Sequence, residues 1–221
     1  MEYQKELLDS GHLVCMDETC RFGRDALELA SFVKVCKGDH ICDLGAGSGI
    51  LSVKLAEKAE AVMVDCVEKN PSAYEVLCQT VRENTLPLHP ILADWNNLEP
   101  WIPAGSMDLV ISNPPYFMEN AGKNAASSQR REARLTADET APLDVCMSAA
   151  RLLKNGGLFY VCYRPERLTD LLTAMRQAGL EPKELRFLCH TKKEEPWLVL
   201  CKGKKGGKSG LAVSFSKGEM T

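Results

Sequence analysis

Between residues 40 and 179, segments with a strand-like pattern of hydrophobic positions alternate with segments that have a helix-like pattern. Short apolar runs typical of buried strands are followed by segments whose apolar residues recur at helical spacing. Thr136 and Glu139 form a capping-box pair that predicts the start of one helix, and Gly156 predicts its end. The predicted strands are 40–47, 61–68, 90–95, 106–112 and 158–164, and the predicted helices are 48–59, 70–85, 136–157 and 165–179. This alternation predicts an open, mostly parallel α/β sheet with helices on both faces.

The pattern changes after residue 179. Residues 185–190, 196–203 and 211–216 are predicted strands, and no helix separates the first two, so we expect these two to pair antiparallel. We expect a mostly parallel seven-stranded sheet with an antiparallel hairpin at its edge, which is one strand fewer than the eight predicted segments. We expect residues 1–221 to form a single domain, in which residues 1–39 are a helical cover and residues 40–221 carry the sheet.

Composition changes this picture little. Of the 221 residues, 45% are apolar and 26% are charged, as in ordinary globular proteins, and the net charge of −3 does not by itself indicate nucleic-acid binding. The opening "MEYQKELLDS" is no signal peptide, and no apolar run reaches the ~18 residues of a membrane span. We therefore expect a cytoplasmic protein. The ten cysteines lie mostly in apolar runs and lack metal-ligand spacing, so we expect reduced thiols and no metal site.

A glycine-rich loop follows the first predicted strand. Asp43 lies at the end of that strand, Gly45, Gly47 and Gly49 follow, and a helix begins at once. Positions without side chains let a ligand approach the backbone, and the helix start offers free N–H donors. The loop lacks the Gly-x-Gly-x-x-Gly spacing of a dinucleotide site, because Ile50 occupies the position of the third glycine. The spacing favours a ligand without a pyrophosphate.

Acidic residues follow the next two predicted strands. Glu68 ends the second strand, where an acid would accept hydrogen bonds from both ribose hydroxyls. Asp94 follows the third strand, where it would meet an adenine amine. Either acid alone is more often a solvated loop residue. Combined with the glycine loop, on the ligand-binding side of such a sheet, they predict a site for S-adenosylmethionine.

The fourth predicted strand ends in Asn113-Pro114-Pro115-Tyr116. The amine of a base or an amide is a poor nucleophile because its lone pair is delocalised. The side-chain oxygen of Asn113 and the carbonyl of Pro114 would orient such an amine and stabilise the positive charge that develops during methyl transfer. The two prolines would fix the backbone, and Tyr116 would stack on a flipped-out base. Asn113 would also border the cofactor, and a purely structural turn is the alternative.

Two basic segments are candidate RNA contacts. Charge runs of this kind are usually solvated turns, but two runs beside one cleft in an acidic protein are better interpreted as phosphate contacts. Their residues are Arg130, Arg131 and Arg134 in the first segment, and Lys202, Lys204, Lys205 and Lys208 in the second.

Several motifs together resemble those of a known family. They are "RFGRDALELASF", "DLGAGSG", "SNPPYF", "QRREARLT", "LLKNGGLFYVCYRPERL" and "KGKKGGKSGL". The chain resembles the class I, Rossmann-like methyltransferases that modify planar nitrogens, and more specifically the bacterial tRNA (adenine-N6)-methyltransferases that act on the adenosine beside the anticodon of a valine tRNA. The resemblance implies a tRNA substrate, S-adenosylmethionine as methyl donor and no obligate protein partner. One departure is Arg24, where the family usually has a small residue, often Thr, and this difference affects the contacts expected with the cofactor carboxylate.

Other functions remain open at this point. The Asn-Pro-Pro-Tyr sequence also occurs in methyltransferases of protein glutamine amides, although these usually carry an additional helical N-terminal domain. An rRNA base is another possible substrate. A non-catalytic RNA-binding module with the same fold is a third alternative, which the intact Asn113 and Tyr116 disfavour.

Overall fold

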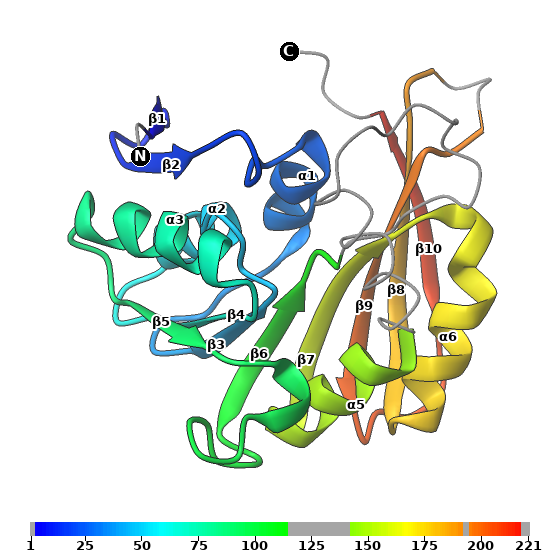
Figure 1. The fold of residues 1–221 in the computed structure, drawn as a ribbon. Coiled ribbons are helices and arrows are strands. Elements are labelled where there is room, and N and C mark those ends of the chain that lie inside the picture. The colour runs from blue at the N-terminus through cyan, green and yellow to red at the C-terminus, as the bar shows by residue number, and fades with distance from the viewer. Residues whose placement is uncertain (1–2, 115–141, 192–194, 218–221) are drawn as a thin grey trace, which may run out of the picture.

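The computed structural model describes residues 3–114, 142–191 and 195–217 (Figure 1). In these ranges eight strands form one sheet in the order β10-β8-β9-β7-β6-β3-β4-β5. Their bounds are β3 (His40–Leu44), β4 (Met63–Glu68), β5 (Leu88–Leu92), β6 (Met107–Ser112), β7 (Leu153–Tyr163), β8 (Leu180–Cys189), β9 (Leu198–Lys205) and β10 (Ala212–Lys217). All neighbours are parallel except β9, which is antiparallel to both β7 and β8. The mostly parallel α/β sheet with an antiparallel hairpin is confirmed. The strand predicted at 211–216 is observed as β10, which lies outside the hairpin, so the sheet has eight strands and the expected total of seven was one too few.

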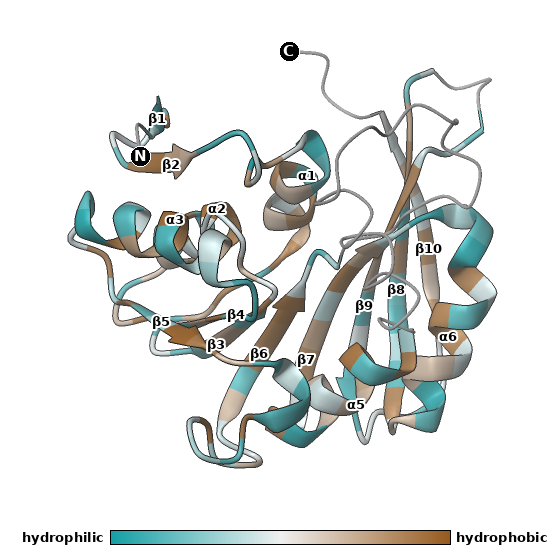
Figure 2. Ribbon diagram, in the orientation of Figure 1, coloured by the Kyte–Doolittle hydropathy of each residue, from teal (hydrophilic) through white to brown (hydrophobic). Residues whose placement is uncertain are grey.

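Helices cover both faces of this sheet. They are α1 (Arg24–Phe32), α2 (Ile50–Ala56), α3 (Pro71–Arg82), α5 (Pro142–Leu152) and α6 (Leu168–Gln177), with short helical turns η1 (Trp95–Asn97) and η2 (Pro165–Arg167). Successive strand residues point to opposite faces, so that Ile41 joins the core under α1 and α2, while Cys42 joins the core under α5 and α6. Figure 2 shows hydrophobic stretches along the strands between these two helical layers. In the described part of the chain, no helix combines the length and apolar character needed to cross a membrane.

The N-terminal segment is not the purely helical cover that the sequence predicted. β1 (Gln4–Leu7) and β2 (Leu13–Met16) form a separate antiparallel pair before α1. The pair is attached by side chains at the C-terminal end of α3 and just after it. The Leu13 N–H donates to Asn84 Oδ1 over 3.0 Å, and the Cys15 N–H donates to Thr80 Oγ1 over 2.9 Å. Short strands of this kind depend on partners distant in sequence, which local periodicity does not report.

Of two predicted helix limits, one differs from the structure and the other lies outside the described residues. Helix α5 ends at Leu152, not at Gly156, and residues 153–157 form the irregular start of β7. Gly156 still adopts a left-handed conformation, with φ of 82°, but it does so within the irregular start of β7. The capping box at Thr136 and Glu139 lies outside the described residues.

Candidate functional site

The candidate site lies where the strand order of the sheet reverses. From β3 the chain first adds β4 and β5 on one side, and then returns to add β6 on the other side of β3. Open α/β sheets bind ligands at this point, beyond the carboxyl ends of the strands. The Ser112 hydroxyl at the end of β6 donates to the Leu44 carbonyl at the end of β3 over 2.8 Å. The structure therefore brings the glycine loop and Asn113 to neighbouring strand ends.

Glycine is required in the loop at two positions for steric reasons. Gly45, Gly47 and Gly49 have φ of 81°, 54° and 84°, in the left-handed region. A Cβ atom at Gly45 would lie 3.2 Å from the Trp95 ring, and one at Gly49 would lie 2.8 Å from a methyl group of the buried Leu77. The loop backbone is thereby held close to its surroundings. Its N–H groups also fix it, because those of Gly45 and Ala46 donate to the Val67 carbonyl and that of Gly49 donates to the Ala46 carbonyl.

Glu68 is already bonded to this loop. Its Oε2 accepts from the Gly47 N–H over 2.9 Å, and its Oε1 accepts from the Asn70 N–H over 2.8 Å. The side chain is buried at the end of β4. An ionised carboxylate has about four acceptor positions, so two remain for further donors such as hydroxyl groups. The predicted ribose acceptor is thus oriented by the backbone before a ligand arrives.

Asp43 provides a buried acceptor without a partner. Its Oδ2 accepts from the Ser52 hydroxyl over 2.7 Å, whereas its Oδ1 has no hydrogen-bond partner in the described part of the chain. Burial raises the pKa of this carboxyl to about 7, the negative charge of Glu68 acts in the same direction, and the Ser52 bond opposes it. A cationic or donor group at the site would satisfy this oxygen. S-adenosylmethionine carries an ammonium and a sulfonium, so the residues present fit that ligand.

Asp94 and Trp95 border the loop on the β5 side. The Asp94 carboxylate caps the η1 turn, because its Oδ1 accepts from the Asn96 N–H over 2.9 Å. Trp95 is buried and packs beside Gly45, and the Lys69 ammonium lies 6.0 Å from its ring centroid. Trp95 was not predicted as a site residue, although its place directly after Asp94 was a usable signal.

Cys20 covers the loop from the N-terminal side and was also not predicted. Its Sγ lies 3.8 Å from the position of a Cβ atom at Gly47. Burial raises the pKa of this thiol to about 12, and the charge of Glu68 contributes in the same direction. The thiol is therefore uncharged at neutral pH and serves as an apolar wall. Nothing in the local pattern around Cys20 indicates this contact, which arises from the path of the chain before α1.

Asn113 is half-buried at the end of β6, followed by the buried Pro114. The thiol of Cys162 on the adjacent strand β7 donates to Asn113 Oδ1 over 2.9 Å. This bond uses one lone pair of the amide oxygen and fixes its orientation. Cys162 was assigned only to a buried strand by the sequence, because its role depends on the register of β6 with β7. Pro115 and Tyr116 lie outside the described residues.

The lysine segment lies apart from the glycine loop and Asn113. Because β9 is antiparallel to β7, it runs away from the carboxyl edge, and its lysines lie toward the opposite edge of the sheet (Figure 1). Lys202 donates to Glu184 over 2.7 Å, and Lys205 donates to the Leu153 carbonyl over 2.7 Å. Lys204 and Lys208 are exposed. Arg130, Arg131 and Arg134 lie outside the described residues.

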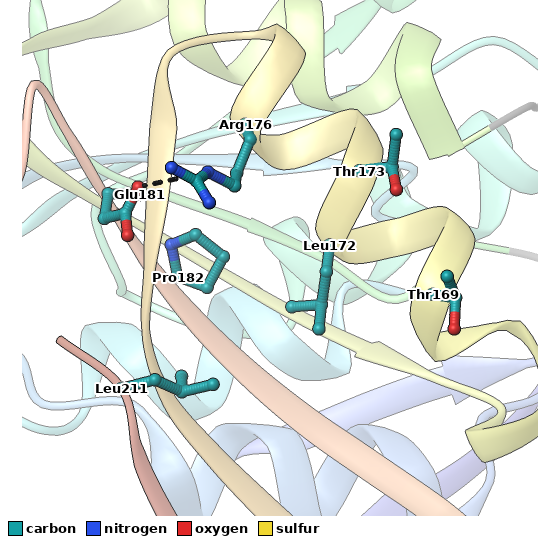
Figure 3. Close-up of a pocket in the computed structure, with 7 residues that line it drawn as sticks. All are labelled: Thr169, Leu172, Thr173, Arg176, Glu181, Pro182 and Leu211. Atoms are coloured by element: carbon teal, nitrogen blue, oxygen red, sulfur yellow. Dashed lines mark ion pairs between the residues drawn. The ribbon is translucent and has the colours of Figure 1, made fainter. Parts of the chain in front are cut away.

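A pocket of about 370 Å³ lies elsewhere, along α6 (Figure 3). Leu172, Pro182 and Leu211 line it, and the ion pair of Arg176 with Glu181, 3.6 Å apart, lies at one end. It shares no residue with the glycine loop or with Asn113. Among the described residues, no group of three or more His, Cys, Asp or Glu side chains could hold a metal ion.

A family model and several curated proteins are similar to this chain in sequence. A family model described as "Methyltransferase small domain" matches residues 25–178. The tRNA1(Val) (adenine(37)-N6)-methyltransferase of Salmonella enteritidis is 30% identical over 156 residues, which cover 69% of this chain and 62% of that relative. The chain thus spans less than two thirds of the length of this curated relative.

Solved structures show a similar fold at low sequence identity. A protein of Agrobacterium tumefaciens described as a predicted O-methyltransferase has a TM-score of 0.68 and 20% identity, and the match covers 87% of this chain and 85% of that one. TYW2 of M. jannaschii, solved in complex with AdoMet, has a TM-score of 0.59 and 18% identity, with 91% and 85% of the two chains covered.

Proposed function

The chain belongs to the methyltransferase small domain family, and we propose that its substrate is the exocyclic amine of an adenine in tRNA. It is an S-adenosylmethionine-dependent methyltransferase. The observation that carries the choice of an amine is the position of Asn113 beside the glycine loop at the switch point of the sheet. The choice of tRNA adenine is supported by the tRNA1(Val) (adenine(37)-N6)-methyltransferases to which the chain is similar.

The cofactor is held, in this proposal, by the residues around the glycine loop. The backbone of Gly45, Gly47 and Gly49 approaches it closely, Glu68 accepts from its ribose and Asp94 from its adenine amine. The unpaired Asp43 oxygen faces its positive charge, and Asn113 borders its reactive end. When bound, S-adenosylmethionine supplies an electrophilic methyl group on a sulfonium.

Asn113 orients the amine that receives the methyl group. Its Oδ1, which the bond from Cys162 orients, accepts from the amine N–H in this proposal. The Pro114 carbonyl is the second acceptor. As the amine nitrogen becomes positively charged, both oxygens stabilise it without having to reorient, which is how preorganised dipoles lower a barrier. Tyr116 stacks on the extruded base, and the released proton passes to water.

RNA contacts beyond the target base come from the basic segments. Arg130, Arg131 and Arg134 follow the Asn-Pro-Pro-Tyr sequence closely, and we assign them to the nucleotides around the target. Lys204 and Lys208 are exposed, whereas Lys202 and Lys205 already have partners in the fold. A folded RNA is large enough to contact both edges of the sheet, so the lysines are assigned to phosphates distant from the target.

The test is a comparison of substrates with isotopically labelled methyl donor. The protein is incubated with total tRNA, total rRNA or a release factor that carries a glutamine amide, and label in each fraction is counted. Nucleosides from digested tRNA are then separated, and we expect N6-methyladenosine. Label in the release factor alone would replace the RNA assignment with a protein substrate. Label in no fraction, with cofactor binding intact, would favour a non-catalytic RNA-binding role.

A further inference from the structure

Arg24, Trp197 and His190 form a cluster at the carboxyl edge of the sheet. The rings of His190 and Trp197 are stacked, with centroids 5.6 Å apart and an interplanar angle of 8°. The guanidinium carbon of Arg24 lies 5.7 Å from the centroid of Trp197. Arg24 is the first residue of α1, His190 follows β8 and Trp197 precedes β9, so three separate elements bring these planar groups together.

The cluster is fixed by backbone contacts. The Trp197 N–H donates to the Leu188 carbonyl over 2.9 Å, and Arg164 Nη1 donates to the Trp197 carbonyl over 3.0 Å. The indole ring packs in part against the core under α1, while His190 is exposed. A ligand would therefore meet a preformed surface, which reduces the entropy lost on binding.

The cluster is close to the amine site. Arg164, which holds Trp197, follows Cys162 by two residues along the same strand end, and Cys162 donates to Asn113. A group that stacks on the cluster would thus lie next to a group held by Asn113.

The contacts of Arg24 within the fold leave part of its guanidinium without an acceptor. A positive charge at the start of a helix opposes the helix dipole, and the start of α1 has no side-chain cap. Its Nε donates to Glu28 over 3.2 Å, but Nη2 of Arg24 and Nε1 of Trp197 have no acceptor in the described ranges. Buried donors are rarely left in this state, so an acceptor from a ligand would complete the cluster.

We propose that the Arg24–Trp197–His190 cluster binds an unpaired base of the RNA next to the target adenine. Unpaired bases are recognised by stacking on aromatic rings and guanidinium planes, and their ring nitrogens, carbonyls and phosphates accept hydrogen bonds. This assignment rests on the proposed function and extends it, because it makes the substrate a single-stranded region such as a loop. A duplex keeps its bases stacked inside and cannot use the cluster.

Tryptophan fluorescence tests the contact directly. The full chain is titrated with a short RNA hairpin whose loop contains adenines, and with the same strand annealed to its complement. We expect the hairpin to quench the emission and the duplex not to do so. Trp197→Phe should abolish the quenching. Trp101→Phe should retain it, because Trp101 is 58% exposed and lies before β6 at the opposite edge.

Affinity and kinetics give the second measurement. Trp197→Leu should bind the hairpin roughly ten- to hundred-fold more weakly, the range expected when stacking on one base is lost. Arg24→Lys keeps the charge but loses the planar group, so it should weaken binding several-fold. Both variants should raise KM for the hairpin more than they lower kcat. Calorimetry with S-adenosylmethionine checks that each variant is folded.

The outcomes separate this proposal from the function on which it rests. If Trp197→Leu binds and methylates the hairpin like the parent, the stacking site is wrong and the methyltransferase assignment stands. If the parent methylates no RNA and labels a protein substrate, both assignments are wrong. Equal quenching by hairpin and duplex would show a non-specific contact and would also overturn the stacking site.

Discussion

At the scale of single residues, the amide of Asn113 connects the fold to the proposed chemistry. Asn113→Ala removes the acceptor that orients the amine, and this acceptor acts mainly in the transition state. We expect a large fall in kcat, while the dissociation constant of S-adenosylmethionine stays within about two-fold of the parent. Single-turnover methylation at saturating tRNA and calorimetry with the cofactor measure the two effects.

Cys162→Ser provides the matched control for this prediction. A hydroxyl keeps a donor toward Asn113 Oδ1, so this variant should retain most of the activity, and Cys162→Ala should lose more than Cys162→Ser. Turnover of Asn113→Ala equal to that of the parent would remove Asn113 from the chemistry.

Asp43 makes the stability of the ligand-free protein depend on pH. Its carboxyl has a pKa of about 7 in the fold instead of the usual 3.8, so the folded state binds this proton more tightly than the unfolded state does. Stability from this group is therefore greatest below pH 4, falls as pH rises toward 7, and is constant above. At 1.36 kcal/mol per pH unit, the difference is roughly 4 kcal/mol.

Asp43→Asn removes that titration. Urea unfolding at pH 5 and pH 8 should show that the variant gains stability relative to the parent at the higher pH. Asp9→Asn, at an exposed position, should show no such gain. The prediction fails if the difference between Asp43→Asn and the parent is the same at both pH values.

At the scale of elements, the glycine loop and α2 depend on backbone conformations that only glycine tolerates well. Gly49→Ala places a Cβ at φ of 84° and 2.8 Å from Leu77, which is fully buried and cannot move aside easily. Left-handed strain and overpacking together should cost roughly 2–5 kcal/mol of unfolding free energy. Gly38→Ala is the control, because Gly38 has φ of 81° but no atom near the added Cβ.

This pair separates strain from packing. Gly38→Ala should lose only the unfolding free energy that corresponds to backbone strain, roughly 1–2 kcal/mol, and should bind cofactor normally. Gly49→Ala should also bind the cofactor more weakly, because the loop backbone shifts. Equal losses of stability in the two variants would show that the contact with Leu77 has no energetic weight.

Elements with local signals could be predicted, and those that depend on distant partners could not. Asn70 accepts from the Ser72 N–H over 2.9 Å at the start of α3, as expected of an Asn-Pro start signal. In contrast, β2 is held by Thr80 of α3 and by Asn84, which follows that helix, and no local pattern reports these contacts. The same limit applies to the site. The predicted strand ends were sufficient to predict Asp43, Glu68 and Asn113 as site residues. The contact of Cys20 depends on the path of the chain, and that of Cys162 depends on the register of two strands.

At the scale of the whole molecule, the lysine segment illustrates how direction follows from topology. The sequence did predict that the strands at 185–190 and 196–203 pair antiparallel. That pairing already implies that residues 202–208 point to the amino edge, away from Asn113. The lysine segment thus lies apart from Asn113, and the arginine segment lies outside the described residues. A role of the lysines in RNA binding therefore requires an RNA that extends beyond the amine site.

The salt dependence of tRNA binding tests that requirement. Each phosphate contact contributes a slope of roughly −0.7 to −0.9 in a plot of log affinity against log salt. Lys202 and Lys205 have partners in the fold, so only Lys204 and Lys208 are free to lose a phosphate contact without structural cost. Replacing these two with Ala should flatten the slope by roughly 1.4–1.8 for full tRNA.

Two comparisons make the lysine prediction specific. A hairpin limited to the target loop is too short to reach the amino edge, so its slope should be unchanged in the Lys204→Ala/Lys208→Ala variant. Lys5→Ala/Lys37→Ala removes the same charge from exposed positions outside the segment and should leave the tRNA slope unaltered. If both double variants flatten the tRNA slope equally, the effect is one of net charge alone. If neither does, the glycine-rich lysine turn is only a solvated connection between β9 and β10. The affinity for RNA must then come from contacts at the carboxyl edge, where Asn113 and the Arg24–Trp197–His190 cluster lie.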